Sequence, residues 1–330
     1  MKVVLLPGDG IGPEISDAAR RALAELASDL AVEEHVFGAA AIRATGDPLP
    51  EETLAACRGA DAVLKGPIGD PEFDAADVRP EQGLLRLRSE LAVYANLRPA
   101  RAAGIDLLIV RELVGGLYYG ASGVREDGTV FDTCEYHPDQ VERIARRAFE
   151  LARARGSTLT SVDKANVLET SRMWRRVVRD VAAGYPDVSV EDMLVDNAAM
   201  QLAAAPEQFD VIVTDNMFGD ILSDLAAAMT GGLGVAPSAS LGDSAPGLFE
   251  PVHGSAPDVA GRGVANPAAM LRSTALLLEH AFGRQEEAAA LEAAVDRALT
   301  DAPTPDLGGT ATTAEFTDAA LTALGTSRTL

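Results

Sequence analysis

Residues 210–229 have the sequence DVIVTDNMFGDILSDLAAAM, which predicts a strand over 210–214 followed by a helix over 218–229. Asp220 and Asp224 stand four residues apart, so their side chains share one helix face, with Cβ atoms about 5–6 Å apart. Two carboxylates this close repel each other unless a cation lies between them, and Mg²⁺ or Mn²⁺ prefers such oxygen ligands. Two solvated surface acids are the alternative. The pair follows a strand end, where open α/β sheets bind ligands, and we therefore expect a divalent metal site here.

The alternation of strand and helix continues outward in both directions. Further strands are predicted at 3–6, 62–64, 106–110, 159–162 and 188–194, and further helices at 14–30, 84–94, 139–155, 168–183 and 198–205. Strands that alternate with helices of about 10 to 18 residues indicate an α/β fold, with a mixed and largely parallel sheet covered by helices.

Two segments interrupt this pattern. Residues 115–136 carry aromatic and β-branched residues around Asp127-Gly128, a dipeptide typical of hairpin turns, and predict a β-hairpin arm. Residues 231–267 are rich in Gly, Pro and Ser and predict a long functional loop. Three helical segments are expected over 267–324.

The composition restricts the class of protein. The 330 residues include 50 Asp and Glu against 28 Lys and Arg, a formal charge of −22, so binding to nucleic acid is not expected. The length suits two domains, and no segment has the roughly 18 to 20 apolar residues of a membrane helix. The isolated Cys57 and Cys134 suit inert thiols in a reducing cytoplasm, where we expect the protein to be located.

The glycine-rich segment 8–13 has the sequence GDGIGP. The GxGxxG fingerprint of dinucleotide-binding Rossmann folds requires a third glycine where Pro13 stands, so that fold is not indicated. What remains is a tight turn that needs glycine, with Pro13 suited to an early helical position. The pattern alone is equally compatible with a purely structural role.

Three arginines border apolar segments: Arg88, Arg98 and Arg111. A guanidinium fixed at a strand end can bind a carboxylate through two parallel hydrogen bonds, although surface arginines are common. Together with a metal ion, the three arginines would form a binding site for a small polycarboxylate.

Proton transfer has further candidates among the remaining polar residues. Lys164 is one of only three lysines and follows the strand at 159–162; nearby cations disfavour an ammonium group and thereby turn a lysine into a base. Tyr118 and Tyr119, in the arm, each offer an acidic hydroxyl, although a tyrosine pair in a hairpin more commonly packs. His253 stands alone in the 231–267 segment and is not expected to be catalytic.

Six motifs together resemble those of the β-decarboxylating dehydrogenases, the family of isocitrate and isopropylmalate dehydrogenases. They are LPGDGIGPE at 6–14, NLRPA at 96–100, VRELVGGLYYG at 110–120, SVDKANVLE at 161–169, FGDILSDL at 218–225 and FEPVHGSAPD at 249–258. They occur in the family's order over almost the full chain. The resemblance implies a large cofactor-binding domain at 1–93 and 231–330, and a small dimerisation domain at 94–230 whose arm at 115–136 pairs with a second copy.

The resemblance also implies roles for individual residues. Asp220 and Asp224 would bind Mg²⁺ or Mn²⁺ together with Asp196 from a partner copy, while Lys164, aided by Asp196, acts as base and Tyr118 as acid. Substrate-binding residues would be Arg88, Arg98, Arg111, Leu84, Leu85 and Asn166. NAD-binding residues would be Glu81, His253, Gly254, Ser255, Ala256, Asp258, Val259 and Asn266. Because Lys164 and Asn166 would also serve the partner's site, a homodimer is expected, and assembly into a tetramer is left open.

The implied reaction is the NAD⁺-dependent oxidative decarboxylation of (2R,3S)-3-isopropylmalate to 4-methyl-2-oxopentanoate, a step of leucine biosynthesis. Leu84 and Leu85 stand where isocitrate-specific relatives have hydrogen-bonding residues, which favours an isopropyl group over a third carboxylate. Asp258 would accept from a ribose 2′-hydroxyl but repel a 2′-phosphate, which favours NAD over NADP. A tartrate or D-malate dehydrogenase of the same family is one alternative. A catalytically silent metabolite-binding dimer is another, disfavoured because Lys164, Tyr118 and the three aspartates are all present.

Overall fold

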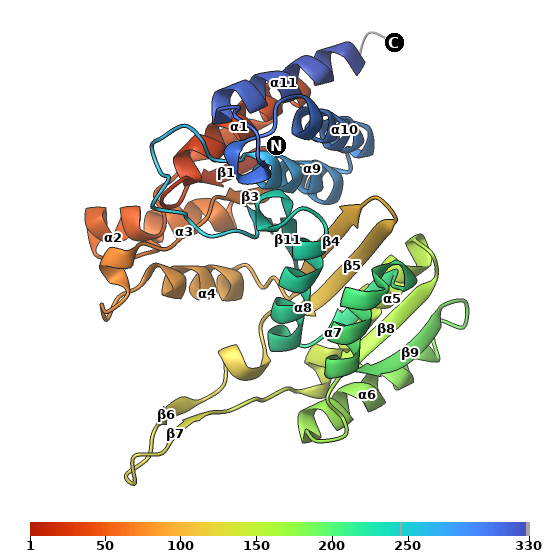
Figure 1. Cartoon of the computed structure of the whole chain (residues 1–330). Coiled ribbons are helices and arrows are strands. Elements are labelled where there is room, and N and C mark those ends of the chain that lie inside the picture. Colours follow the sequence, from red (N-terminus) through yellow and green to blue (C-terminus); the bar gives the residue numbers. More distant parts are fainter. Residues whose placement is uncertain (245, 328–330) are drawn as a thin grey trace. The chain divides into compact units, whose positions relative to one another are not determined.

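The computed structural model describes residues 1–244 and 246–327. The chain divides into two compact units, Met1–Val93 with Leu233–Leu330 (unit 1) and Tyr94–Gly232 (unit 2) (Figure 1). The sequence placed this boundary after residue 230, two residues earlier, and the roles assigned to the two domains stay predictions. Within the described residues, none of the helices combines the length and the apolar character needed to span a membrane.

Unit 1 contains a mixed sheet in the order β2-β1-β3-β12-β11. Its strands are β1 (Lys2–Leu6), β2 (Ala31–Glu34), β3 (Ala62–Lys65), β11 (Pro237–Leu241) and β12 (Gly247–Pro251). β1 pairs in parallel with β2 and β3, β12 is parallel to β3, and β11 is antiparallel to β12.

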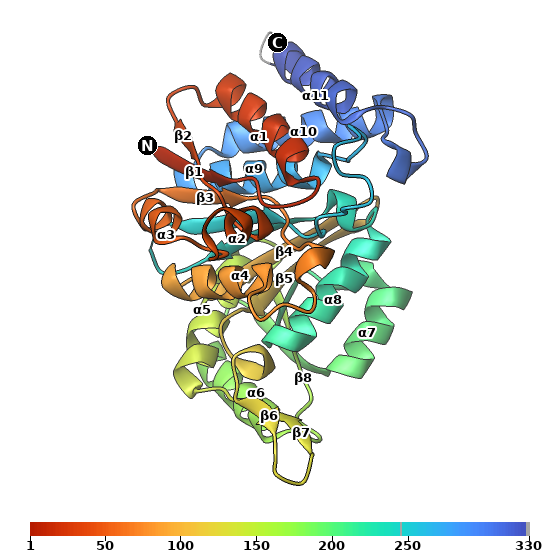
Figure 2. The ribbon, with the colours of Figure 1, turned by 90° about the vertical axis from the view of Figure 1, so that its left-hand side faces the viewer.

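Helices lie on both sides of this sheet. They are α1 (Gly12–Leu26), α2 (Ala39–Thr45), α3 (Glu51–Arg58), α4 (Pro80–Glu90), α9 (Ala268–Phe282), α10 (Gln285–Asp301) and α11 (Thr313–Ser327). Figures 1 and 2 show α1, α9, α10 and α11 together on one side and α2, α3 and α4 on the other. Most of α9 is buried because it packs directly on β3, β11 and β12 while α1 and α10 cover it.

The structure corrects two expectations for unit 1. The segment 231–267 is not one long loop, because β11 and β12 lie within it and are almost entirely buried. The helix expected over 84–94 is α4, which begins at Pro80 and ends at Glu90; Ala92 has a φ of 50°, outside the helical range.

The turn at 8–13 has a clear structural role in unit 1. The carboxylate of the buried Asp9 accepts hydrogen bonds from the backbone N–H groups of Ala39, Ala40 and Gly69, each 3.0 Å long. Two of these groups belong to the first turn of α2, whose N–H groups have no partner within the helix. Asp9 therefore ties the glycine turn to α2 and to the loop after β3.

Unit 2 contains five strands that pair in the order β4-β5-β10-β8-β9. Its strands are β4 (Ala95–Ala102), β5 (Ile105–Glu112), β8 (Thr158–Asp163), β9 (Ser189–Leu194) and β10 (Val211–Thr214). β4 and β5 form an antiparallel hairpin, and the remaining pairs are parallel. The strand β4 was not expected from the sequence.

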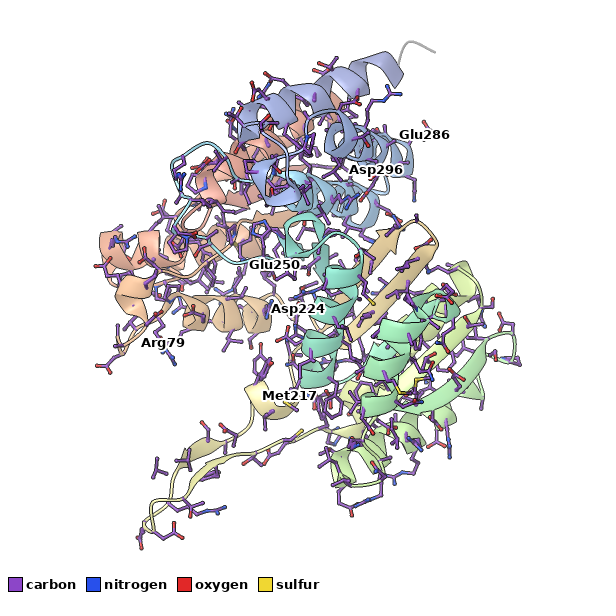
Figure 3. The ribbon with its side chains drawn as sticks, in the orientation of Figure 1. Arg79, Met217, Asp224, Glu250, Glu286 and Asp296 are labelled. Atoms are coloured by element: carbon purple, nitrogen blue, oxygen red, sulfur yellow. The ribbon has the colours of Figure 1, made fainter. Side chains whose placement is uncertain are left out.

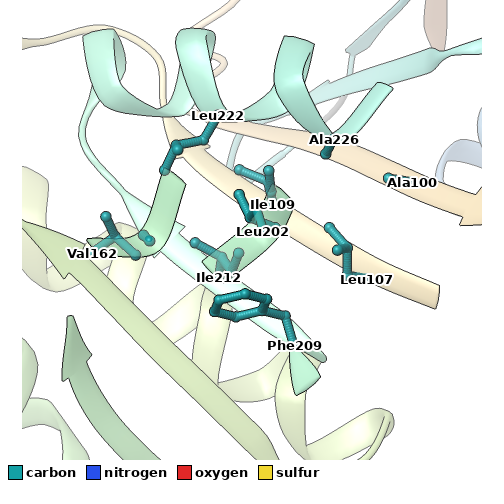
Figure 4. Close-up of a cluster of buried hydrophobic side chains, with 10 residues drawn as sticks. Ala100, Leu107, Ile109, Val162, Leu202, Phe209, Ile212, Leu222 and Ala226 are labelled. Atoms are coloured by element: carbon teal, nitrogen blue, oxygen red, sulfur yellow. The ribbon is translucent and has the colours of Figure 1, made fainter. Parts of the chain in front are cut away.

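Two pairs of helices pack on these strands of unit 2. α5 (Pro138–Ala154) and α6 (Glu169–Ala182) pack together, as do α7 (Val195–Ala204) and α8 (Asn216–Met229). Alternate strand residues such as Leu107, Ile109 and Ile212 meet Leu202 and Leu222 of α7 and α8 in a buried apolar cluster (Figure 4). This packing fixes α8 beside the ends of β5 and β10 and so positions its two aspartates.

The β-hairpin predicted within 115–136 is confirmed. β6 (Ser122–Val124) and β7 (Val130–Asp132) pair antiparallel, and Gly128 takes a positive φ of 86° in the turn between them. Val124 and Val130 pair with each other and are 69% and 72% exposed. The arm thus carries apolar side chains that its own chain does not cover.

Candidate active site

Arg111, Asp220 and Tyr118 form one contact group in unit 2. Arg111 lies at the carboxyl end of β5 and is only 3% exposed, and its Nη1 donates to Oδ1 of Asp220 on α8. Tyr118, in the short 3₁₀ helix Gly116–Tyr118, donates its hydroxyl to Oδ2 of the same aspartate at 2.9 Å. Arg111, a candidate for binding the substrate carboxylate, and Tyr118, a candidate acid, therefore both contact Asp220, a candidate metal ligand.

Arg98 and Asp224 form a similar pair. Arg98 lies on β4, the strand next to β5, and Asp224 lies on α8. Nη1 of the buried Arg98 lies 3.9 Å from Oδ1 of Asp224, and its Nε donates to Oδ1 of Asn96 at 2.8 Å. Figure 3 labels Asp224 on α8. Burial raises the pKa of Asp224 against the lowering effect of Arg98, and the nearby Asp220 carboxylate raises it further. A bound cation would relieve this repulsion.

The donor chemistry of Asp220 and Asp224 fits Mg²⁺ or Mn²⁺, because both offer carboxylate oxygens on one helix face. Within residues 1–244 and 246–327 of one copy, no group of three or more His, Cys, Asp or Glu side chains gathers into a metal site. The third ligand expected from the sequence, Asp196, accepts a hydrogen bond from Lys164 and does not join Asp220 and Asp224 within one copy. Its contribution from a partner copy stays a prediction.

Lys164 and Asp196 lie together at the carboxyl end of β8. Nζ of Lys164 donates to Oδ1 of Asp196 in the first turn of α7, and this bond lowers the pKa of Asp196. The Asp196 side chain is 66% exposed, and Asn166 is exposed in the turn that follows β8. All three candidates therefore present polar groups at the surface of this unit.

Arg88 belongs to a buried charge cluster in unit 1. Its Nη2 lies 3.0 Å from Oε1 of Glu250 on β12, whose Oε2 lies 2.8 Å from Nζ of Lys65 at the end of β3. Lys65 is 2% exposed and Glu250 5%. Figure 3 labels Glu250. Burial alone would raise the pKa of Glu250, but Lys65 and Arg88 lower it to about 2. The Arg88 Nε is also buried and has no hydrogen-bond partner, and Leu84 and Leu85 on the same helix are half-buried.

The loop after β12 carries most of the candidate cofactor residues. The carbonyl of Ser255 accepts from the N–H of Ile11 at 2.8 Å, and its hydroxyl donates to the carbonyl of Gly69 at 2.6 Å. A Cβ added to Gly69 would lie 3.5 Å from Oε1 of Glu81 and 3.7 Å from the Ser255 hydroxyl. Glu81 and Ser255 therefore flank the same glycine, and the 8–13 turn holds the loop in place.

His253 offers an unsatisfied polar atom in this loop. Its Nδ1 lies 2.9 Å from the carbonyl of Gly254, while Nε2 is buried without a hydrogen-bond partner, and burial lowers the pKa of the ring. Gly254 and Asp258 are exposed, and Ala256 and Val259 are half-buried. Asn266 is buried and donates to Asp306 at 3.0 Å. A neutral ring with a free nitrogen beside exposed polar groups fits an adenine dinucleotide.

Sequence reasoning missed four residues that hold these side chains. They are Asn96 beside Arg98, Asn216 beside Arg111, and Lys65 and Glu250 beside Arg88. Lys65 had a usable signal, because it is one of three lysines and ends an otherwise apolar strand. The two asparagines had none, since a polar residue near a strand end is usually exposed.

Comparisons with known proteins place the chain in a family. A family model described as isocitrate/isopropylmalate dehydrogenase matches residues 2–320. The chain is 51% identical to a 3-isopropylmalate dehydrogenase of Zymomonas mobilis, over 98% of this chain and 100% of that protein, and 53% identical to one of Shouchella clausii, over 90% and 89%. Among solved structures, an isocitrate dehydrogenase from Methylococcus capsulatus superposes with a TM-score of 0.90 at 37% identity, covering 98% of this chain and 99% of that one. The chain belongs to the isocitrate/isopropylmalate dehydrogenase family.

Proposed function

We propose that this protein is an NAD- and divalent-metal-dependent 3-isopropylmalate dehydrogenase of leucine biosynthesis. Relatives with that name are about half identical to the chain over most of their length, which supports this substrate over isocitrate, D-malate or tartrate. The observation that carries the proposal is the contact of Arg111 and Tyr118 with the two oxygens of Asp220. It joins a cation for carboxylates, an acid and a metal ligand in one group.

The reaction needs two proton transfers that these residues can perform. Oxidation of the substrate removes a hydride from the carbinol carbon and a proton from its hydroxyl, and we assign that proton to Lys164, aided by Asp196. The adjacent carbon then loses CO₂ and takes a proton, which we assign to the hydroxyl of Tyr118. Arg88, Arg98 and Arg111 would bind the two carboxylates of the substrate.

The bound groups would supply what side chains cannot: NAD⁺ would accept the hydride, and a cation held by Asp220 and Asp224 would withdraw electron density from the substrate oxygens. His253, Gly254, Ser255, Ala256, Asp258, Val259, Asn266 and Glu81 would orient the dinucleotide. The exposed Asp258 supports NAD over NADP, because it would repel a 2′-phosphate.

We also propose a homodimer in which Lys164, Asn166 and Asp196 serve the partner's site. Apolar side chains exposed on unit 2 support this assembly, among them Val124, Val130, Val167, Met200 and Ile221, which are 59% to 72% exposed. The cytoplasmic location stays a prediction.

The test is NADH formation by the purified protein with 3-isopropylmalate and, separately, D-malate, tartrate and isocitrate. We expect the highest kcat/KM with 3-isopropylmalate, loss of turnover in EDTA, and recovery with Mg²⁺ or Mn²⁺. A higher kcat/KM with D-malate would replace the proposed substrate, and full turnover in EDTA would remove the cation from the mechanism.

A further inference from the structure

Asn216 is a buried side chain whose whole hydrogen-bonding capacity is directed at the candidate site. It is the first residue of α8 and is 1% exposed. Its Oδ1 accepts from Nε and Nη2 of Arg111 at 3.0 and 2.7 Å. Its Nδ2 donates to the carbonyls of Leu113 and Gly115 at 3.1 and 3.0 Å. A carboxamide offers two lone pairs and two N–H groups, and all four are used.

The orientation of this amide is fixed by its partners. A guanidinium only donates hydrogen bonds and a backbone carbonyl only accepts them, so a flipped Asn216 would lose all four bonds. The amide therefore occupies the Nε and Nη2 edge of Arg111 and leaves Nη1 directed at Asp220. A Cβ on Gly219 would lie 2.6 Å from Cγ of Arg111, so the arginine stem is also confined from the side of α8.

The same amide holds the turn that carries Tyr118. Gly115 directly precedes the 3₁₀ helix Gly116–Tyr118, and its carbonyl is one of the two that Asn216 binds. The Tyr118 hydroxyl in turn contacts Asp220. One side chain thus connects the arginine and the tyrosine that flank this aspartate.

The start of α8 does not need the Asn216 side chain. The preceding Asp215 caps the helix, because its carboxylate accepts from the N–H of Phe218 at 2.8 Å. The backbone N–H of Asn216 donates to the hydroxyl of Tyr136 at 3.0 Å. Capping therefore does not explain why this side chain is an asparagine.

We propose that Asn216 is a positioning residue for the reaction: its amide sets the edge of Arg111 that meets the substrate carboxylate and holds the turn that presents Tyr118. This proposal rests on the proposed function and extends it to a residue that touches neither substrate nor cofactor. The two parts of this proposal can be tested separately, because Oδ1 of Asn216 binds Arg111 while Nδ2 binds the backbone of the turn before Tyr118.

Two variants separate these parts. In Asn216→Asp one oxygen still accepts from Arg111, while the other faces two carbonyls and repels them, which releases the turn. We expect KM for 3-isopropylmalate within about threefold of wild type and a kcat at least about tenfold lower. Asn216→Leu removes both functions, and we expect KM to rise about tenfold or more as kcat falls.

The double variant with Tyr118→Phe distinguishes positioning from general loss of structure. If Asn216 acts on kcat through Tyr118, Asn216→Asp lowers kcat much less in the Tyr118→Phe background than in wild type. Equal effects in both backgrounds would overturn the proposal. The matched control is Thr214→Val, two residues before Asn216. It removes a buried 2.9 Å hydrogen bond to the carbonyl of Val162 and should leave kcat and KM unchanged.

Failure of the positioning role can be distinguished from failure of the proposed function. If wild type is inactive with 3-isopropylmalate but turns over another substrate, the same variants are measured with that substrate. If it turns over none, crystal structures of wild type and Asn216→Leu decide the matter. An Arg111 guanidinium and a 116–118 turn that both stay in place in the variant would overturn the positioning role, whereas a shift of either supports it.

Discussion

The Tyr118 hydroxyl donates to Oδ2 of Asp220, so the candidate acid and a candidate metal ligand are coupled. Burial raises the pKa of Tyr118, and the Asp220 carboxylate raises it further. The hydroxyl is therefore held in its protonated form, as an acid requires. A cation that binds Asp220 would compete with this hydrogen bond.

Removal of the Tyr118 hydroxyl should reduce turnover and spare metal binding. In Tyr118→Phe we expect kcat to fall about a hundredfold or more, because no acid remains for the final protonation. The affinity for Mn²⁺ should stay equal or increase, since Oδ2 of Asp220 loses a competing donor. Steady-state kinetics and calorimetric titration with Mn²⁺ check both parts. The neighbouring Tyr119→Phe is the control, and Mn²⁺ binding weakened tenfold in Tyr118→Phe alone would contradict the coupling.

The sequence predicted the parts of the fold that have strong periodicity, and the structure shows why the rest escaped. β11 has the sequence PSASL, whose small and polar residues show no apolar pattern typical of a strand. It is nevertheless buried in the structure. β4 contains Arg98 and Pro99, which weakened any prediction of a buried strand. Tertiary packing decides such segments.

The candidate site was predictable where its residues have distinctive spacing. Asp220 and Asp224 stand four residues apart on one helix, and they do face the two strand arginines. Asn216 and Glu250 were not predictable, because their importance lies in partners about 100 or more residues away, as the separations of 105 and 162 residues show.

Mixed inactive variants should regain activity if the sites are shared between two copies. Lys164→Ala and Asp220→Asn would each be inactive alone. In a hybrid dimer one site would receive an intact Asp220 from one copy and an intact Lys164 from the other. Unfolding and refolding an equimolar mixture should restore about a quarter of wild-type activity, since about half of the dimers are hybrids with one intact site.

The control mixture combines Lys164→Ala with Asp196→Asn. Both residues would serve the partner's site, so neither site of this hybrid is intact and no activity should return. Recovery in the control, or none in the first mixture despite hybrids detected by mass spectrometry, would contradict the shared site.

Glu250→Gln should destabilise the protein, because it leaves Lys65 and Arg88 as two buried cations without a countercharge. The expected loss is about 3–5 kcal/mol in the free energy of unfolding, measured with urea at neutral pH. Adding Lys65→Met should recover part of it, since one uncompensated charge is then removed. If the single variant is as stable as wild type, the cluster does not contribute in this way.

The same cluster predicts acid sensitivity. The pKa of Glu250 is about 2 in the folded protein and 4.5 ordinarily, so its contribution to stability is present above about pH 4.5 and is lost as the pH falls toward 2. The Glu250→Gln variant should lack this component of the acid transition. Parallel pH dependence in the two proteins would contradict the assignment.

Glu112 predicts an opposite pH dependence. It is fully buried in unit 2, its Oε2 has no hydrogen-bond partner, and Nη2 of Arg143 is 3.6 Å from Oε1. Burial raises the pKa of Glu112 to about 7, although Val114 N–H and Arg143 oppose the shift. The folded protein therefore binds a proton that the unfolded chain releases near pH 4.5, and the stability that Glu112 contributes below that pH is lost as the pH rises toward 7.

Glu112→Gln removes this ionisation. The stability of the variant relative to wild type should therefore increase as the pH rises from about 4.5 to 8. The difference in unfolding free energy should change by up to about 3 kcal/mol over that range. Urea unfolding at a series of pH values measures it, with the exposed Glu142→Gln as control. If the wild-type and Glu112→Gln stabilities run parallel, then Arg143 compensates the Glu112 carboxylate and the residue is ionised in the folded protein throughout this range.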